Sequence, residues 1–496
     1  MTATLPRSTH TDDEDLSGLG YQPTLHRKLG RYASFAAGFS FVSILTTIFQ
    51  LFAFGYSFAG PAFFWTWPLV LGGQLLVALV FAELAAQLPL SGAVYQWSRR
   101  VGGETVGWFA GWFMALAQVV TAAAAAIALQ VVLPQLWDGF QLVGGDPALT
   151  TVTGATNAVV LGALLLTVTT VINSIGVGIM SRINSIGVTC EIVGVIAVVL
   201  ALATAARRGP DVVVDTSALP ADGLGATGAF LVSALMAAYV MVGFNSAGEL
   251  SEETRDPRRT APRTILSALL VSGLGGALML LTALMAAPSL TDGRLATEGL
   301  PYVITAVLGT FWGKVLLVDV AIAIVVCTLA IQTAGSRLVF SMARDGQLPA
   351  SRWLAHVDPR RGTPMWPSVA IGVLAVGLLA VNIGNAALFT TLSSVCIVMI
   401  YLAYLLVSVP TLVARLRGRF TPSEPGLFSL GRWGLPINIA AVVYGAAMVV
   451  NLSWPRPEVY DPTGEHPWLT WSAPAVAVGV LLLGLLARST RKPVAA

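Results

Sequence analysis

The stretch MVGFNSAGELSEETRDPRRTAPR, residues 241–263, decides how this chain is expected to fold. It begins at the end of an apolar run, residues 226–242, and small and polar residues interrupt that run before an Arg- and Pro-rich segment follows. No water reaches backbone groups in the core of a bilayer, so an interrupted helix persists there only where its loose N–H and C=O groups face a cavity or a ligand. Half-helix ends at mid-depth commonly build a solute site. We therefore interpret this stretch as one half of such a site.

The composition predicts an all-α integral membrane protein. Of the 496 residues, 55% are apolar and only 11% are charged, whereas a soluble domain carries about 25% charged residues. Apolar runs of roughly 20 residues recur, each long enough to cross about 30 Å of hydrocarbon as a helix. Twelve spans are expected, with these approximate bounds: 34–58, 62–87, 105–133, 151–173, 178–205, 226–250, 264–287, 313–340, 366–384, 387–413, 435–453 and 469–487.

The distribution of positive residues predicts which way the chain is inserted. With the N-terminus in the cytoplasm, 23 of the 28 Lys and Arg residues fall in cytoplasmic segments, as the positive-inside rule requires. We therefore expect a multi-pass protein of the plasma membrane with cytoplasmic tails at both ends, residues 1–33 and 488–496. Residues 1–20 include four acidic residues in a row and are predicted to be disordered.

The first apolar run contains polar residues at a similar depth. Ser43, Thr46 and Thr47 lie near its middle. Ser and Thr also fit an ordinary membrane helix by bonding back to its own carbonyls, so an uninterrupted helix is equally compatible with this pattern. Spans 1 and 6 are five apart, however, and interrupted helices at matching positions of two halves indicate an inverted repeat. The expected parts are two five-helix repeats, residues 34–205 and 226–414, and spans 11 and 12 over residues 435–487.

Several kinds of chemistry find no support in the sequence. The three cysteines lie inside apolar runs, and no Cys or His spacing indicates a metal site. The stretch GTFWGK, residues 309–314, has the wrong glycine spacing for a phosphate loop and lacks the Ser or Thr that should follow. No paired carboxylate or nucleophile set of an enzyme is apparent. We expect no cofactor and no nucleic-acid partner, so the energy for any solute movement has to come from an ion gradient or from exchange.

A set of motifs resembles a known family. The motifs are FAEL at 81–84, SGAVYQW at 91–97, GFNSAGELSEET at 243–254 with DPRR and APR close behind it, and SR at 336–337 with RDGQLP at 344–349. Together they resemble the amino acid–polyamine–organocation (APC) superfamily of permeases, and within it the amino acid/choline transporter group. Each motif alone would be weak, but the set covers most of the first ten spans.

The resemblance implies a five-plus-five inverted repeat with two extra helices, alternating access, and small amine-bearing substrates bound between spans 1 and 6. Carried over to this chain, it implies these binding residues: Ser43, Ile44, Leu45, Thr46, Thr47, Gly243, Phe244, Asn245, Ser246 and Ala247. The chain departs from the group at Asn245, where Asp is frequent, and at Glu249, where His is frequent. Since Asn has no formal charge, the first departure argues against a strictly cationic substrate.

An amino acid zwitterion suits two half-helix ends. An N-terminal end presents unpaired N–H groups and partial positive charge to a carboxylate, and a C-terminal end presents carbonyls to an ammonium group. The break in span 1 would supply the first and the break in span 6 the second. We expect Phe244 and residues of spans 3, 8 and 10 to complete the pocket.

Acidic residues inside apolar runs are costly and need a reason. At the position of Glu191, several related permeases hold a lysine that replaces a coupling sodium ion, and here the glutamate would bind and release a proton or be a structural carboxyl. Glu249 would gate the site or carry protons, and Glu83 would be a packing or gating partner of a cytoplasmic arginine. Asp319 is expected to pair with Lys314.

The Arg- and Pro-rich segment is either a topology signal or part of an inner gate. Glu252 and Glu253 are expected to pair with its arginines, residues 255–263. Taken together, these features favour a secondary active transporter of amino acids or related small amines, coupled to protons. The alternatives are a choline or polyamine carrier, an amino acid exchanger and, from a different class, a solute sensor that does not transport.

Overall fold

Helices make up the framework of the molecule. In a computed structural model, the residues described are 12–215, 225–381, 383, 388–460 and 467–489. They form helices α1 to α20 with short 3-10 turns and no β-strand, apart from an isolated bridge between Leu29 and Thr254.

Nine helical segments of the described chain are long and apolar enough to cross a membrane. They contain α2 (Arg31–Val42), α3 (Ile44–Ala59) and α4 (Thr66–Gln87); α6 (Glu104–Ile127) and α7 (Leu129–Leu136); α8 (Val152–Ile175); α9 (Val177–Thr204); α12 (Pro257–Ala286); α14 (Leu300–Arg344); α17 (Leu388–Leu416); α18 (Gly434–Ser453); and α20 (Ser472–Ser489). The first segment, residues 31–87, covers two predicted spans. The shorter apolar helices α10 (Gly225–Val240) and α16 (Met365–Val381) lie where spans 6 and 9 are predicted. The count of twelve and the inverted repeat stay predictions.

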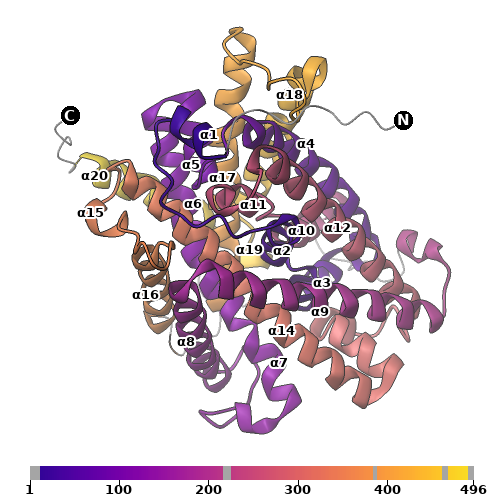
Figure 1. The fold of residues 1–496 in the computed structure, drawn as a ribbon. Coiled ribbons are helices and arrows are strands. Elements are labelled where there is room, and N and C mark those ends of the chain that lie inside the picture. The colour runs from indigo at the N-terminus through magenta and orange to yellow at the C-terminus, as the bar shows by residue number, and fades with distance from the viewer. Residues whose placement is uncertain (1–11, 216–224, 382, 384–387, 461–466, 490–496) are drawn as a thin grey trace, which may run out of the picture.

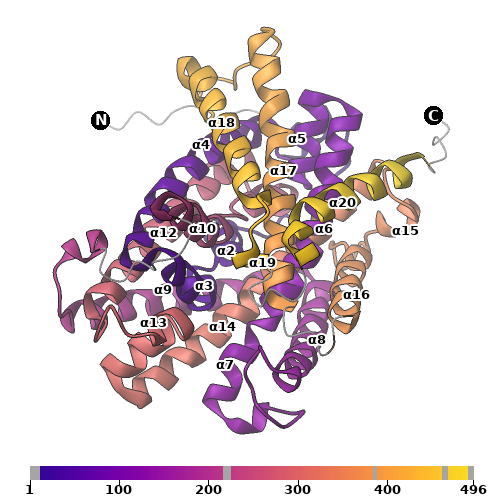
Figure 2. The ribbon, with the colours of Figure 1, turned by 180° about the vertical axis from the view of Figure 1, so that it is seen from behind.

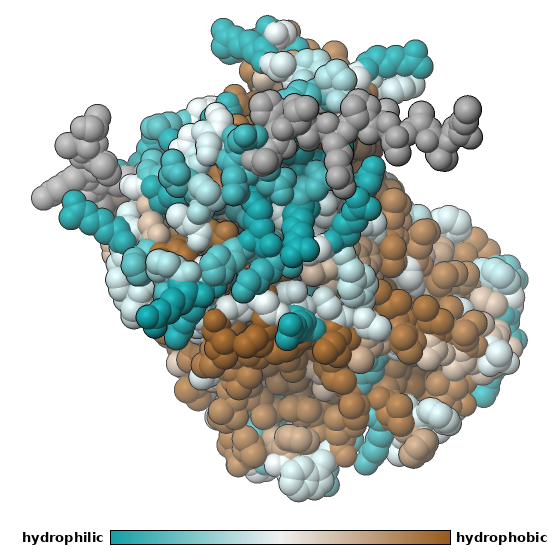
Figure 3. All heavy atoms as spheres, viewed as in Figure 1, coloured by the Kyte–Doolittle hydropathy of each residue, from teal (hydrophilic) through white to brown (hydrophobic). Residues whose placement is uncertain are grey.

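The outer surface fits a bilayer. On α8, Val160, Leu164, Val168 and Val171 recur at helical spacing, and each is more than a third exposed. Side chains of this kind on one face of a helix face lipid when the helix spans a membrane. Figure 3 shows hydrophilic residues gathered over one side of the molecule, around α1 and α5, and hydrophobic residues over much of the remaining visible surface.

The interrupted helices lie at the centre of the bundle. α2, α10 and the short α11 (Ser246–Glu249) are surrounded by α6, α12, α14 and α17 (Figures 1 and 2). α18 and α20 lie outside, and only 33% and 11% of the most apolar stretch of each is buried. The fold therefore places polar breaks where water is excluded, and the helices at the edge carry few polar groups.

The N-terminal segment is folded, so the prediction of a disordered tail is wrong for the residues after 11. Residues Asp12–Gly18 form α1, and Leu16 is only 3% exposed. Arg258 on α12 pairs with Asp15, and the guanidinium of Arg100 donates to the carbonyl of Leu19 at 2.6 Å. The acidic run is held because Arg258 pairs with Asp15 and Arg27 pairs with Asp13. Residues 1–11 lie outside the described chain.

The amphipathic stretch before predicted span 3 is helical and largely buried. It forms α5 (Ala93–Gly102), in which every residue from 93 to 98 is buried. The indole of Trp97 donates to the carbonyl of Leu88, and a side chain added at Gly248 of α11 would meet that indole. The glycine thus lets α5 approach α11 and enter the bundle.

Candidate functional site

Span 1 breaks at Ser43. This residue has left-handed dihedrals, φ 37° and ψ 76°, between the last residue of α2 and the first of α3. That conformation costs an L-residue about 1–2 kcal/mol, so surrounding contacts have to offset it. The Ser43 hydroxyl lies 2.7 Å from Thr46 Oγ1 and 3.0 Å from an oxygen of Glu191, and the Thr47 hydroxyl donates to the carbonyl of Ser43. The polar residues of this run therefore stabilise the break.

Span 6 breaks between Val240 and Ser246. Gly243 has φ 92°, and a Cβ at this position would run into the ring of Phe41 on α2. The Tyr404 hydroxyl on α17 donates to Asn245 Oδ1 at 2.6 Å and accepts from the amide of Gly243 at 3.1 Å. Asn245 thus ties the loose backbone of the break to α17.

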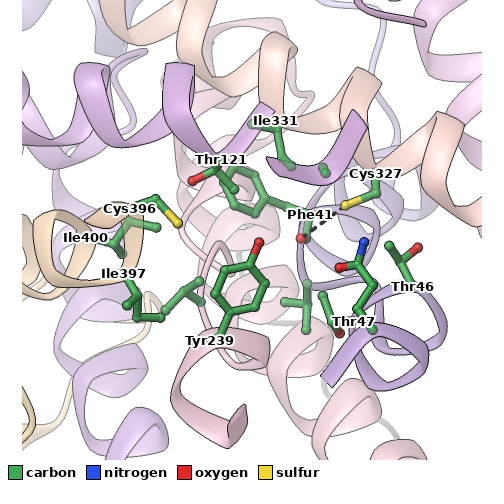
Figure 4. Close-up of a pocket in the computed structure, with 14 residues that line it drawn as sticks. Phe41, Thr46, Thr47, Thr121, Tyr239, Cys327, Ile331, Cys396, Ile397 and Ile400 are labelled. Atoms are coloured by element: carbon green, nitrogen blue, oxygen red, sulfur yellow. Dashed lines mark hydrogen bonds between the residues drawn. The ribbon is translucent and has the colours of Figure 1, made fainter. Parts of the chain in front are cut away.

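A cavity of about 20 Å³ lies between the two breaks (Figure 4). This is room for about one water molecule, so the site is nearly closed. Its polar lining consists of Thr46, Thr47 and Gln50 from α3, Thr121 from α6, and Tyr239 from α10. Apolar side chains and two cysteines of α14 and α17 complete it.

The cavity has hydrogen-bonding groups but no formal charge among the described residues that line it. Phe41 and Val42 bring the C-terminal end of α2 to its wall, and Tyr239 and Val242 bring the C-terminal end of α10. Both helix ends present carbonyls and partial negative charge. The side-chain nitrogen of Gln50 is buried, without a hydrogen-bond partner among the described residues. The site therefore offers acceptors for a cation and a donor for an anion.

Glu191 lies beside the span 1 break on α9 and is fully buried. Its Oε1 accepts from Leu45 N at 3.2 Å, which is one of the first amides of α3, and its Oε2 has no hydrogen-bond partner among the described residues. No Lys, Arg or His of the described chain pairs with it within 4 Å. The amide of Leu45, expected to be free for a substrate, is thus taken by the protein itself.

Two opposing effects act on the charge of this carboxyl. Burial in a low-dielectric interior without a cation favours the neutral form. The amide of Leu45 and the positive end of α3 favour the ionised form. A group in this balance is suited to switch between the two forms when its surroundings change.

Glu249 and Glu83 are also buried, with different partners. Glu249 follows Asn245 by one turn and accepts from its side-chain nitrogen at 3.4 Å, and its carboxyl faces the amides that open α5. Glu83 on α4 forms an ion pair with Arg415 of α17 and accepts from the amide of Leu430. Glu83 therefore joins α4 to α17, a partnership of the kind expected from the sequence.

Two further ion pairs close the same end of the bundle, which we call the arginine-rich side. Glu253 binds Arg337 of α14 in a bidentate pair at 2.9 Å, with both side chains 0% exposed. Glu252 binds Arg344 in the same way at 2.8 Å. The expected pairing with arginines 255–263 is wrong, because α14 passes directly beside these glutamates. No local sequence pattern indicates that α14 lies next to these glutamates.

The N-terminal segment covers this side. The Tyr21 hydroxyl donates to Asp345 at 2.9 Å, and the Arg344 guanidinium lies 4.0 Å from the centre of the Tyr21 ring. Burial, followed by the charge of Asp345, raises the pKa of Tyr21 above its usual value. The amide of Leu29 donates to the carbonyl of Glu253 at 2.9 Å. Residues 12–30 thus connect the ends of several helices.

The opposite side is closed by the segment between α12 and α14. It contains α13 (Arg294–Thr297), whose Leu295 is buried, and Gly299 lies against Ala53 of α3. The Tyr56 hydroxyl of α3 donates to the carbonyl of Leu290 at 2.6 Å. The Arg294 guanidinium and the Tyr302 hydroxyl hold the pKa of Asp292 well below its usual range. Both approaches to the cavity are therefore covered.

The predicted site residues fall into two groups. Thr46 and Thr47 line the cavity, whereas the other eight binding residues named from the sequence do not. Phe244 packs against Phe81 and Tyr404 instead of facing the cavity. Asp319 does not pair with Lys314, whose amine donates to the carbonyl of Leu136. It faces Gly194 on α9, because α14 turns its carboxyl toward that helix.

The residues that sequence reasoning missed are Gln50, Thr121 and Tyr239. All three are polar residues within or at the end of apolar helices, and this is a weak signal because polar residues occur throughout such helices. Only the packing of α3, α6 and α10 around one cavity singles them out.

Comparison with known proteins identifies the family of this chain. A family model described as amino acid permease matches residues 29–482. The amino-acid permease BAT1 of Arabidopsis thaliana is 27% identical over 489 residues, covering 93% of this chain and 91% of that protein. Its homologue in Oryza sativa subsp. japonica is 28% identical, covering 95% and 92%. The thiamine transporter thi9 of Schizosaccharomyces pombe is 25% identical, covering 91% and 81%.

The family match spans nearly the whole chain, includes both helix breaks and the closed cavity between them, and accords with the apolar spans. The chain is a member of the amino acid permease family within the APC superfamily, and it is a multi-pass membrane transporter of amino acids or related compounds rather than an enzyme.

Proposed function

We propose that this permease is a secondary active transporter that moves amino acids across the plasma membrane by alternating access, coupled to protons. The observation that supports this most is the closed cavity between the two helix breaks, which no formal charge lines among the described residues. A site that holds both ends of a zwitterion with helix ends and neutral polar groups needs no net charge of its own.

The substrate ammonium group would lie against the carbonyl ends of α2 and α10. Its carboxylate would accept from the side-chain amide of Gln50 and the hydroxyl of Thr46, because the Thr47 hydroxyl already donates to the carbonyl of Ser43. The two isoleucines of α17 at 397 and 400 would contact the substrate side chain. Because the cavity has room for only about one water molecule, substrate binding has to push these walls apart, and a small side chain is favoured.

Glu191 would carry the coupling proton. Its buried carboxyl contacts the span 1 break directly, so the proton and the shape of the break are linked. Protonation removes a charge that attracts the amide of Leu45, and this frees an N–H group at the positive end of α3. Proton binding and substrate binding thus act on the same helix end.

Alternating access requires one of the two covers to open at a time. The arginine-rich side would face the cytoplasm, together with both termini, and the segment with α13 would face outside. The buried pairs of Glu252 and Glu253 would break when the inner side opens. In this proposal the structure corresponds to an occluded state.

Uptake of radiolabelled amino acids into proteoliposomes, with and without an inward proton gradient, tests this function. We expect uptake above the equilibrium level only with the gradient. Equal uptake without it, together with exchange of preloaded substrate, would identify an exchanger. Saturable binding without any flux would identify a sensor. In a separate arm, a sodium gradient replaces the proton gradient. Uptake that only the sodium gradient drives would contradict proton coupling.

The choline or polyamine carrier is the alternative with less support. A permanent cation in this cavity would have only helix-end carbonyls and no formal counter-charge among the described lining residues. Competition decides between the two: we expect alanine to block uptake of labelled amino acids and choline or putrescine to leave it unchanged.

A further inference from the structure

A second, larger cavity lies on the arginine-rich side, away from the central site. Its volume is about 830 Å³, and it lies between the end of α4, α5, the start of α6 and the second half of α17. A cavity of this size can hold a ligand of several hundred daltons. Nothing in the transport site described above uses it.

Three arginines surround this cavity: Arg100 on α5, and Arg417 and Arg419 just after α17. All three are exposed. None of them lies within ion-pair distance of a carboxylate in the part of the chain that the structure describes, although Arg100 donates one bond to the carbonyl of Leu19. Three neighbouring positive charges without a counter-charge repel one another, and an anion between them would remove that repulsion.

Two acidic side chains of the neighbouring segments are already paired with other arginines. Glu83 pairs with Arg415, only two residues before Arg417. Glu424, a few residues after Arg419, pairs with Arg258 of α12. Positive residues on one side are expected of any membrane protein, and these three also line one cavity.

Apart from Gln87 and Thr421, the rest of the lining is apolar, and it continues along α17. Val409 and Val413 line the cavity and are 41% and 38% exposed. Val101 of α5 and Val106 of α6 also line it, and the guanidinium of Arg415 lies 4.0 Å from the centre of the Phe420 ring. The cavity therefore has a cationic end beyond the end of α17 and an apolar wall along the helix.

We infer that this cavity binds an anionic glycerophospholipid of the adjoining leaflet. The phosphate would lie among the three guanidinium groups, whose planar donor sets match phosphate oxygens. The acyl chains would follow the valines of α17, where a free anion makes no contact. Basic pockets beside membrane helices are suited to such headgroups.

Lipid binding here would connect α5 to α17. α5 carries Trp97, which contacts Gly248 of α11, and α17 carries Tyr404, which holds the span 6 break. At the cavity wall Gly102 already approaches Pro410 so closely that a Cβ would lie 2.9 Å from the proline. A bound lipid would thus stabilise this contact, and the protein should unfold at a higher temperature with the lipid present.

Lipid titrations of the full-length protein, delipidated in a neutral detergent, test the inference. Retention of phosphatidylglycerol is measured by native mass spectrometry and the unfolding temperature by thermal shift. Phosphatidylcholine with the same acyl chains and inorganic phosphate alone are run in parallel. We expect phosphatidylglycerol to be retained and to raise the unfolding temperature, and the other two to do neither.

The variant R100Q/R417Q/R419Q removes the charges. Each arginine contributes roughly fivefold to binding of an anionic lipid, so affinity should fall on the order of 100-fold. The matched control R352Q/R360Q/R432Q removes three exposed arginines that do not line the cavity, and it should bind as the wild type does. Val409→Trp fills the apolar part with the arginines intact and should also reduce binding, whereas Val443→Trp on exposed α18 should not.

Three results would overturn the inference. One is equal retention of phosphatidylglycerol by the two triple variants. Another is equal retention of phosphatidylcholine by the wild type. The third is a rise in unfolding temperature with inorganic phosphate as large as the rise with phosphatidylglycerol, because the cavity would then recognise the phosphate group alone.

Discussion

Gly243 shows how one residue can set the shape of the central site. Its φ of 92° and its contact with Phe41 leave no room for a side chain. Gly243→Ala should destabilise the protein by about 1–3 kcal/mol from backbone strain alone, and it should also reduce substrate binding because α2 has to move. Thermal unfolding and binding titrations check both effects. Gly377→Ala on α16, where a Cβ meets nothing within 4 Å, is the control, and an equal effect there would contradict this role.

Glu191 is the residue on which proton coupling depends. Glu191→Gln keeps an oxygen that can accept from Leu45 but cannot take up or release a proton. We expect gradient-driven accumulation to fall at least tenfold, with exchange of preloaded substrate retained and no longer dependent on pH. Glu298→Gln, an exposed carboxyl on the opposite side, should leave all three properties unchanged. Accumulation at the wild-type level in Glu191→Gln would remove this residue from the mechanism.

At the scale of elements, the buried pair of Glu253 and Arg337 joins the segment after α11 to α14. Glu253→Gln leaves a buried guanidinium without its counter-charge, which costs about 3–5 kcal/mol. The free energy of unfolding of the closed arrangement should therefore fall, and unfolding in mixed micelles measures this. Glu104→Gln breaks an exposed pair with Arg99 and should cost less than about 1 kcal/mol. Similar losses in the two variants would show that the buried pair does not hold this side closed.

The N-terminal segment is a second element whose contacts can be tested. Leu16→Asp places a charge where the side chain is only 3% exposed, so α1 should detach from the bundle. Trypsin should then cut after Arg27 or Lys28 several-fold faster than in the wild type. Thr24→Asp changes an exposed residue of the same segment and serves as the control. An unchanged rate in Leu16→Asp would mean that α1 is not held by this contact.

At the scale of the whole molecule, local sequence patterns predicted the two helix breaks but not the ion-pair partners of the buried glutamates. Polar residues inside apolar runs marked Ser43 and Gly243, because a bilayer leaves few other uses for them. The pairing of Glu252 with Arg344 joins residues 92 apart, and no local pattern reveals such a contact. Thr121 and Tyr239 were missed for the same reason, since a cavity exists only once several helices have packed.

The burial of α5 and the folding of α1 were also beyond local reasoning. Both segments are amphipathic or charged, which is typical of solvated chain. α1 is held by the pairs of Asp13 with Arg27 and of Asp15 with Arg258, and α5 is buried because it packs on α6 and α17. Contacts with other segments thus override the local pattern. Only the helix content and the position of the breaks follow from the apolar runs and from the small and polar residues that interrupt them.

The central claim is that the closed cavity between the two breaks holds the substrate, and one binding measurement tests it. Amino acids that stabilise the purified wild type in a thermal-shift screen are titrated against Ala125→Phe, which fills the cavity from α6, and against the lipid-facing control Val160→Phe. We predict at least a tenfold loss of affinity in Ala125→Phe with its fold intact, and none in Val160→Phe. Wild-type affinity in a folded Ala125→Phe protein would contradict the account.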